Sequence, residues 1–295
     1  MAATETTLLC GPGENLVATF TLPVGATDAR GLPVALLTNS GVISRAGPHR
    51  LNVQLARRLA QRGIASVRFD LSGIGDSRRA GGSLGQIEQW VLDTRAIMDV
   101  ASQRLRAESF FMVGFCSGAE VAYRCALAEQ RLIGVLLWDL YAYPTWRSQL
   151  NVFLFRLRRA GTAGLASKLL RKLRVRGDAS NPAQKQLQDL EPARVPAKEE
   201  FGAGLKRLVD RGASVHVMFC GGEPHWYNYP AQFKDSMHGL PGLEKVSCEQ
   251  LAISDHLLTR AVARDAFLES VDRWLEAGVL VSHARPGSSE PARAR

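Results

Sequence analysis

The feature that most constrains this chain is a Gly-x-Cys-x-Gly run centred on Cys116. Residues 109–115 before it are apolar and prone to form a strand, whereas the residues after it favour a helix. Where a strand turns sharply into a helix, the central residue is strained, and the residues two before and two after it must be very small. Gly114 and Gly118 meet this requirement. The pattern therefore predicts a nucleophile elbow that carries a thiol.

The register of this turn selects Cys116 over its neighbour Ser117. If Ser117 were the central residue, Phe115 would take one of the two crowded positions, and its side chain is too large. Ser117 then has another possible role, because the amide after a nucleophile commonly forms half of an oxyanion hole. We assign the other half to the amide of Val42, in the loop that follows the predicted strand 33–39.

A thiol nucleophile needs a base, and the base needs a group that orients it. His256 lies between the last predicted strand and the last predicted helix, where elbow enzymes carry their histidine. Two carboxylates compete to orient it, Asp139 at the end of the sixth strand and Glu223 after the seventh. The sequence leaves this choice open. A Cys–His dyad without a carboxylate is a third possibility, because a thiol, with a pKa of about 8.5, needs less activation than a serine hydroxyl.

Strand-like and helix-like segments alternate along most of the chain, which predicts an α/β fold with a mostly parallel central sheet flanked by helices. Strands are expected at residues 6–10, 15–22, 33–39, 65–71, 109–115, 132–140, 214–220 and 244–250. Residues 142–212 interrupt the alternation, and we expect a basic helical lid there, inserted after the sixth strand. The core domain is then divided into residues 1–141 and 213–280, and residues 281–295 are expected to form a disordered tail.

The composition, with 46% hydrophobic and 22% charged residues among 295, suits a large domain with an ordinary core. Residues 1–5 lack the layout of a signal peptide, and no stretch approaches the roughly 18 apolar residues of a membrane span. The five cysteines show no metal-ligand spacing. We therefore expect a cytoplasmic protein with reduced thiols and no metal. No complete dinucleotide-binding glycine pattern occurs, so no cofactor is indicated.

The net charge of +9 is distributed unevenly. Between Trp146 and Gly177 there are nine basic residues and no Asp or Glu, and leucines at helical spacing indicate amphipathic helices. One interpretation is that the charged face of the lid is simply exposed to solvent. Its alternative is a docking surface for an acidic acyl carrier protein or for the phosphates of coenzyme A. A membrane surface is a less favoured partner, and no nucleic-acid-binding motif accompanies the charge.

Taken together, these features resemble the α/β-hydrolase fold over about residues 33–275. The run Asp70–Ser77 is similar to the Asp-x-x-Gly-x-Gly-x-Ser segment common in that superfamily after the fourth strand. Residues 41–51 resemble the branch of exosortase-associated hydrolases, which is related to serine aminopeptidase-type hydrolases. The chain departs from the superfamily pattern in having cysteine for serine at the elbow. Dienelactone hydrolases and polyhydroxyalkanoate synthases are similar in using a thiol there.

The residues and the resemblance lead to one functional hypothesis with two alternatives. The hypothesis is a thioesterase-like acyl hydrolase or acyltransferase that uses a Cys-His-acid triad and an acyl-cysteine intermediate. It would act in a biosynthetic pathway on a carrier-bound acyl ester or thioester. One alternative is a carboxylesterase or peptidase. The other is a non-catalytic binding module whose site has decayed.

Overall fold

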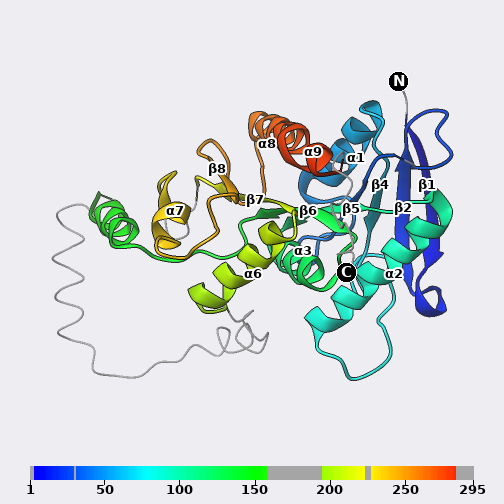
Figure 1. The fold of residues 1–295 in the computed structure, drawn as a ribbon, viewed down its shortest axis with the longest axis horizontal. Coiled ribbons are helices and arrows are strands. Elements are labelled where there is room, and N and C mark those ends of the chain that lie inside the picture. Colours follow the sequence, from blue (N-terminus) through cyan, green and yellow to red (C-terminus); the bar gives the residue numbers. More distant parts are fainter. Residues whose placement is uncertain (1–2, 30, 159–194, 223–226, 284–295) are drawn as a thin grey trace, which may run out of the picture.

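The computed structural model describes residues 3–29, 31–158, 195–222 and 227–283. Within these ranges an eight-stranded sheet lies between two layers of helices (Figure 1). The strand order across the sheet is β1-β2-β4-β3-β5-β6-β7-β8. The strands are β1 (Thr4–Cys10), β2 (Leu16–Leu22), β3 (Val34–Leu37), β4 (Ser66–Phe69), β5 (Phe110–Phe115), β6 (Leu132–Trp138), β7 (Ser214–Cys220) and β8 (Ser247–Leu251).

Most of this sheet is parallel. β1 pairs with β2, and β2 with β4, in antiparallel fashion, whereas all pairs from β4 across to β8 are parallel. Parallel neighbours require a crossover connection, which is usually a helix. Each strand expected from the sequence corresponds to one of those observed, and the predicted α/β fold with a mostly parallel sheet is confirmed.

The helices form one layer on each face of the sheet (Figure 1). One layer consists of α1 (Leu51–Gln61), α8 (Ala261–Trp274) and α9 (Leu280–His283). The other layer consists of α2 (Gln86–Leu105), α3 (Ser117–Ala128) and α6 (Lys198–Asp210). The short α7 (Gln232–Ser236) follows β7 and precedes β8 along the chain. Residues 146–158 are also helical. Among the described helices, none combines the length and apolar character that crossing a membrane requires.

The sheet separates two apolar cores. Along β5, Phe110 and Met112 belong to the core under α2, α3 and α6, while Phe111 and Val113 belong to the core under α1 and α8. This alternation follows from the strand, in which successive side chains point to opposite faces. Because β5 is buried on both faces, its sequence is continuously apolar instead of alternating.

An aromatic cluster supports the carboxyl end of β5. The ring of Phe115 lies 5.7 Å from the ring of Trp138 and 5.0 Å from that of Phe267. The rings of Trp138 and Phe267 meet edge to face at 5.4 Å. Such pairs contribute about 0.5–1.5 kcal/mol beyond their burial. They fix the ends of β5 and β6, from which the next residues of the chain enter the site described below.

The stretch predicted as a lid, residues 142–212, includes two described parts. Its first part contains the helical residues 146–158, and its last part contains α6. α6 buries Phe201, Leu205 and Leu208 in the main core, as expected of the crossover helix between β6 and β7. The prediction for residues 159–194 lies outside the described residues. Of the predicted tail, the first residues continue the helix to His283, and residues 284–295 lie outside the described ranges.

Candidate active site

Cys116 occupies a strained turn between β5 and α3. Its backbone has φ 52° and ψ −118°, outside the regions that a non-glycine residue ordinarily adopts. Its amide donates to the carbonyl of Trp138 at 3.0 Å, which holds the turn against the end of β6. Strain of this kind costs on the order of 1–3 kcal/mol and persists where the surroundings enforce it, often at functional sites. The thiol is partly exposed.

The two glycines that flank Cys116 allow backbones to approach closely. A Cβ atom at Gly114 would lie 2.6 Å from the Cα of Ala119 and closer still to the carbonyl of Gly118. A Cβ at Gly118 would overlap the carbonyl oxygen of Asn39. No side chain fits at either position. The elbow thus packs directly on the loop that follows β3.

His256 and Asp139 meet at the carboxyl end of the sheet. The Nδ1 atom of His256 lies 2.8 Å from Oδ2 of Asp139, whose side chain is 1% exposed. The other carboxylate oxygen of Asp139 accepts the amide of Cys220 at 2.9 Å. The Asp139 backbone has φ 50°, a left-handed conformation that turns the chain away from β6 and aims the carboxylate at the loop after β8.

The loop that carries His256 is tied to the two neighbouring strands. The indole N–H of Trp138 donates to the carbonyl of His256 at 3.0 Å. The amides of Gly221 and Gly222 both donate to the carbonyl of Ser254, at 3.1 and 2.9 Å. These bonds hold the imidazole over the ends of β6 and β7. Preorganisation of this kind reduces the entropy that a reaction must lose when its groups align.

Hydrogen bonding stabilises the protonated form of His256. The bond to Asp139, followed by the contacts with the thiols of Cys116 and Cys220, raises the pKa of His256 to about 12 in spite of partial burial. Since Nδ1 faces Asp139, Nε2 is the atom left for Cys116. An imidazolium between a carboxylate and a thiol is the partner that a thiolate requires. The structure therefore brings together Cys116, His256 and Asp139, and it places Glu223 outside the described residues.

The loop after β3 forms a tight turn beside the elbow. The amide of Ile43 donates to the carbonyl of Ser40 at 2.9 Å, and Val42 at the tip is 86% exposed. The amide of Gly41 donates to the hydroxyl oxygen of Ser117 at 2.9 Å. The predicted oxyanion donors Val42 and Ser117 thus lie on two segments that this bond joins. It is the Gly41 amide that is bonded to the elbow.

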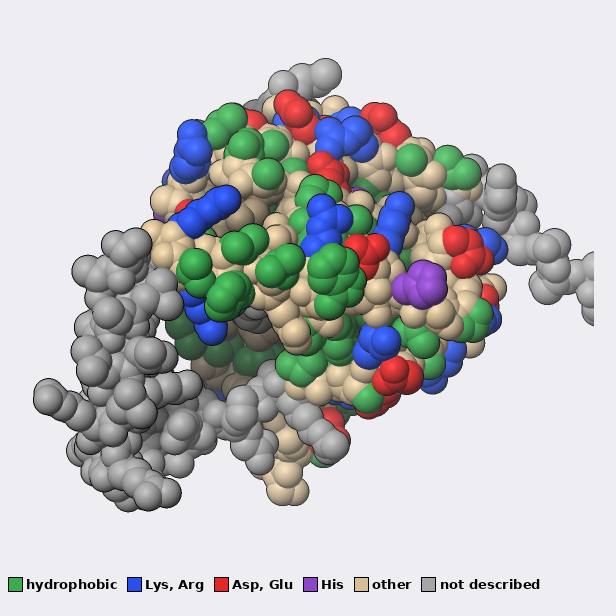
Figure 2. Space-filling view, turned by 90° about the vertical axis from the view of Figure 1, so that its left-hand side faces the viewer, with side chains coloured by type: hydrophobic (Ala, Val, Ile, Leu, Met, Phe, Trp, Pro, Cys, Tyr) green, Lys and Arg blue, Asp and Glu red, His purple; other side chains and the backbone are tan. Residues whose placement is uncertain are grey.

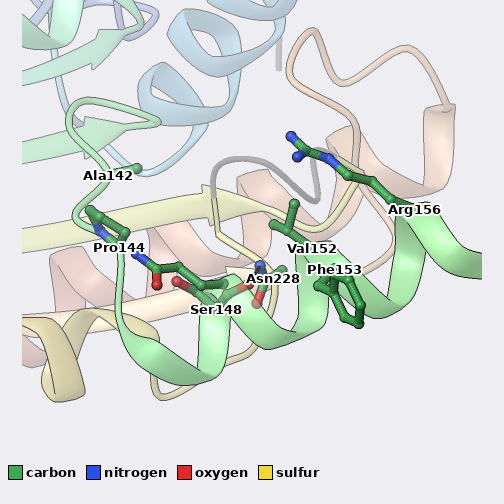
Figure 3. A pocket seen from close by; sticks show the side chains of 8 residues that line it. Ala142, Pro144, Ser148, Val152, Phe153, Arg156 and Asn228 are labelled. Carbon is green, nitrogen blue, oxygen red and sulfur yellow. Dashed lines mark hydrogen bonds between the residues drawn. The ribbon is translucent and has the colours of Figure 1, made fainter. Parts of the chain in front are cut away.

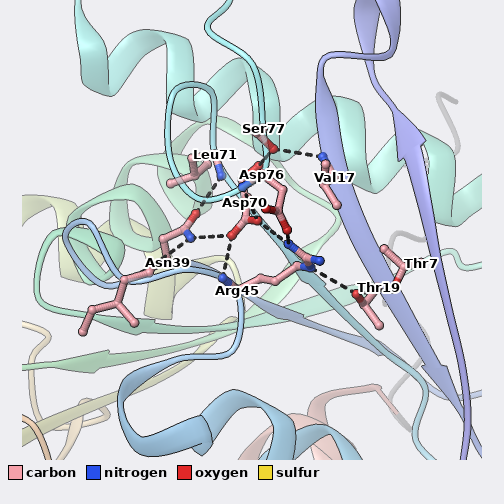
Figure 4. Close-up of polar contacts among 10 residues, drawn as sticks. Thr7, Val17, Thr19, Asn39, Arg45, Asp70, Leu71, Asp76 and Ser77 are labelled. Carbon is pink, nitrogen blue, oxygen red and sulfur yellow. Dashed lines mark hydrogen bonds and ion pairs between the residues drawn. The ribbon is translucent and has the colours of Figure 1, made fainter.

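The buried carboxylate of Asp70 holds this loop in place through hydrogen bonds (Figure 4). Asp70 accepts the Asn39 side-chain amide at 2.9 Å, the Arg45 backbone amide at 2.5 Å and the Asp76 backbone amide at 3.1 Å. The guanidinium of Arg45 bridges Asp70, at 2.5 Å, and Asp76, at 2.6 Å. Asp70 is fully buried, so these partners replace the water that its charge has lost. The network fixes both ends of the turn that carries Gly41.

The glycine-rich run Asp70–Ser77 builds the pocket around this carboxylate. Gly75 has φ +55°, and a Cβ there would lie only 2.5–2.7 Å from the Asp70 carboxylate atoms. The hydroxyl of Ser77 donates to the carbonyl of Asp70 at 2.7 Å and accepts the amide of Val17 at 2.9 Å. The motif therefore has a structural role: it encloses Asp70 and joins it to β2.

Replacing Gly75 with alanine is expected to destabilise the protein far more than the same change at Gly13. Both glycines have positive φ, which costs alanine about 1–2 kcal/mol. A Cβ at position 13 would have no atom within 4 Å. A Cβ at position 75 would instead displace the buried Asp70–Arg45 pair. We expect Gly75→Ala to lower the free energy of unfolding by about 2–4 kcal/mol more than Gly13→Ala does. Urea denaturation measures the difference, and equal losses would contradict this account.

Cys220 was not predicted from the sequence to lie at this site. Its thiol belongs to a compact group with Asp139 and His256, whose ligand-type atoms all lie within 4.8 Å of one another. A signal for it existed. Cys220 ends the strand next to the one that Asp139 follows, and the carboxyl ends of adjacent parallel strands meet at one edge of a sheet.

Comparison with known proteins agrees with this architecture. The family model described as serine aminopeptidase, S33, matches residues 42–195, just over half of the chain. No curated protein matches. Among solved structures, a lidless α/β serine hydrolase from Xanthomonas campestris superposes with a TM-score of 0.53 at 17% identity, covering 94% of this chain and 95% of that one. An esterase from Pyrococcus furiosus gives 0.58 at 14% identity, with 94% and 91% covered. The chain therefore belongs to the serine aminopeptidase S33 family and is an enzyme of the α/β-hydrolase type.

Proposed function

We propose that this enzyme is a thioesterase-like acyl hydrolase or acyltransferase that forms an acyl-cysteine intermediate at Cys116. One observation carries the proposal: a thiol at a strained, partly exposed elbow contacts His256, whose far nitrogen lies 2.8 Å from the buried Asp139 carboxylate. This is the arrangement of nucleophile, base and orienting acid that acyl transfer requires. Glu223 remains a candidate for the acid.

In the first half-reaction the sulfur of Cys116 attacks the carbonyl carbon of the substrate. A C–S bond forms, and the carbonyl π electrons move to the oxygen. Backbone amides of Ser117 and Val42 are the proposed donors to this oxyanion, and each such donor contributes on the order of 3–4 kcal/mol. When the tetrahedral intermediate collapses, the bond to the leaving alcohol or thiol breaks, and Nε2 of His256 protonates the leaving group.

In the second half-reaction the now neutral His256 acts as a base. It removes a proton from water, or from an acceptor alcohol, amine or thiol, as that group attacks the thioester carbonyl. The C–S bond then breaks and Cys116 leaves as a thiolate beside the restored imidazolium. Because a thioester is a reactive acyl donor, the same intermediate serves hydrolysis and transfer.

A pocket whose lining begins three residues after Asp139, at Ala142, supports an apolar acyl substrate (Figure 3). It has a volume of about 420 Å³ and lies between the segment just beyond Asp139, the helical residues 146–158 and Asn228. Its lining combines apolar side chains, Val152 and Phe153 among them, with the guanidinium of Arg156. This combination suits an acyl chain that is attached to an anionic group.

The exposed surface of the same helix, part of which lines the pocket, is both apolar and basic. Six of its large hydrophobic side chains are exposed: Trp146, Leu150, Phe153, Leu154, Phe155 and Leu157. Figure 2 shows this face of the molecule, where hydrophobic side chains gather with Lys and Arg side chains among them beside a hollow. These features support the proposed acidic carrier, an acyl carrier protein or coenzyme A. The names of the family and of the Pyrococcus neighbour keep a peptidase or a carboxylesterase as the second candidate function.

Intact-mass spectrometry of the full-length protein tests the proposal. After brief incubation with acyl-coenzyme A thioesters, p-nitrophenyl esters or aminoacyl anilides, at least one donor is expected to add a single acyl mass, which peptide mapping places on Cys116. The class of donor that acylates fastest separates a thioesterase from an esterase or a peptidase. Cys248→Ser, which changes a half-buried thiol on β8, is the matched control and should still be acylated. An adduct on Ser117, or turnover without any adduct on Cys116, would contradict the mechanism.

A further inference from the structure

Three metal-ligating groups of different chemistry converge at the carboxyl end of the sheet. Asp139 follows β6, Cys220 ends β7 and His256 lies in the loop after β8. One ligand atom from each lies within 4.8 Å of the other two. The three residues are far apart in the sequence, which explains why ligand spacing along the chain gave no indication of them. Two of the three are buried, and His256 is partly exposed.

We propose that Asp139, Cys220 and His256 form an inhibitory binding site for a borderline-soft divalent cation, with Zn²⁺ as the best match. Thiolate, imidazole and carboxylate are the ligand classes that Zn²⁺ takes in proteins. With bond lengths of about 2.0–2.3 Å, the ligand atoms of a tetrahedral site lie about 3.3–3.8 Å apart. The pair Asp139 Oδ2 and His256 Nδ1, now at 2.8 Å, would open by about 0.5 Å to admit the ion.

The surroundings of these residues already fix the ligands in place. The Cys220 amide holds Oδ1 of Asp139 at 2.9 Å, which leaves Oδ2 available to the ion. The indole of Trp138 holds the backbone of His256. Outer contacts of this kind orient ligands and strengthen metal sites. The side chain of His256 is 32% exposed, so an ion can approach from its side. A water can supply the fourth ligand, because Cys116 contacts the opposite edge of the His256 ring.

Binding would stop the reaction proposed above because it changes which nitrogen of His256 carries a proton. The ion replaces two protons, one on Nδ1 of His256 and one on the thiol of Cys220. The proton that remains on the ring sits on Nε2, so the ring cannot take up another proton from an acceptor. Asp139 is engaged by the ion at the same time. Inhibition rests on the proposed function, whereas binding of the cation does not.

Titration of the full-length protein with Cd²⁺, followed by competition with Zn²⁺, tests the site. Cd²⁺ bound to a thiolate gives an ultraviolet charge-transfer band, so binding is observed without an activity assay. One equivalent is expected to produce the band, and Zn²⁺ should abolish it. We expect Cys220→Ala to lose the band and His256→Ala to bind at least tenfold more weakly. Cys248→Ser should match the wild type.

The variants separate this site from other modes of binding. If the band survives in Cys220→Ala and disappears in Cys116→Ala, the cation binds the nucleophile alone and the proposal is overturned. Should Cys220→Ala fail to fold by circular dichroism, His256→Ala decides the matter, and wild-type affinity in that variant overturns the proposal. Acylation of Cys116 is measured on metal-free protein, so the failure of one proposal is distinguishable from the failure of the other.

Discussion

Replacing Cys116 with alanine is expected to lower kcat/KM for the best acyl donor by at least about a thousandfold, because the variant has no nucleophile. Cys116→Ser should retain a fraction of the activity, about 10- to 1,000-fold below wild type. Its hydroxyl occupies the same elbow but has a far higher pKa than a thiol, so the imidazolium of His256 has no thiolate to pair with. Steady-state kinetics on the donors that acylate the wild type give both values.

Two control variants test whether the loss of activity is specific to Cys116. Ser117→Ala removes the hydroxyl that accepts the Gly41 amide, a bond worth about 0.5–1.5 kcal/mol, and is expected to cost less than about tenfold. Cys125→Ala changes a buried thiol in α3 and should leave kcat/KM within about threefold of wild type. If Cys116→Ala keeps a tenth of the activity while Ser117→Ala loses most of it, the nucleophile is Ser117 and the register argument from the sequence is wrong.

The sequence predicted the sheet well because the parallel strands from β3 to β7 are buried on both faces. Runs such as Phe110–Phe115 and Leu132–Trp138 are continuously apolar, and the crossover helices between strands give the chain its alternating pattern. In the region between β6 and β7, the boundary between lid and core was harder to predict. α6 mixes apolar residues with equal numbers of basic and acidic ones, and the packing of Phe201 and Leu205 in the core shows that it is a core helix.

The site was predictable where a local pattern encodes it. The elbow needs two glycines around Cys116, so the sequence reveals it, and the position of His256 follows from the order of elements. The contact between Asp139 and His256 depends instead on a left-handed turn at Asp139, which no local pattern indicates. The contact between Arg45 and Asp70 likewise joins two loops, and only the pairing of their strands brings them together.

Replacing Asp139 with asparagine is expected to lower kcat/KM by about 100- to 1,000-fold. Asparagine keeps the shape of the side chain and can still accept the Cys220 amide, so the loss reports the charge and the proton that the carboxylate holds on Nδ1. The pH profile should change as well. Asp139 is the largest cause of the raised pKa of His256, so its removal lets that pKa fall toward 6.5. The imidazolium is then lost at a lower pH, and the alkaline limb of kcat/KM moves toward neutrality.

Glu223→Gln is the matched comparison, because it removes the competing carboxylate in the same isosteric way. We expect it to change kcat/KM by less than about threefold and to leave the alkaline limb in place. Circular dichroism and thermal unfolding of both variants separate a lost charge from a lost fold. A larger loss in Glu223→Gln than in Asp139→Asn would assign the acid to the loop after β7. Near-wild-type rates in both variants would instead indicate that Cys116 and His256 act as a dyad, since a thiolate–imidazolium pair can form without a carboxylate.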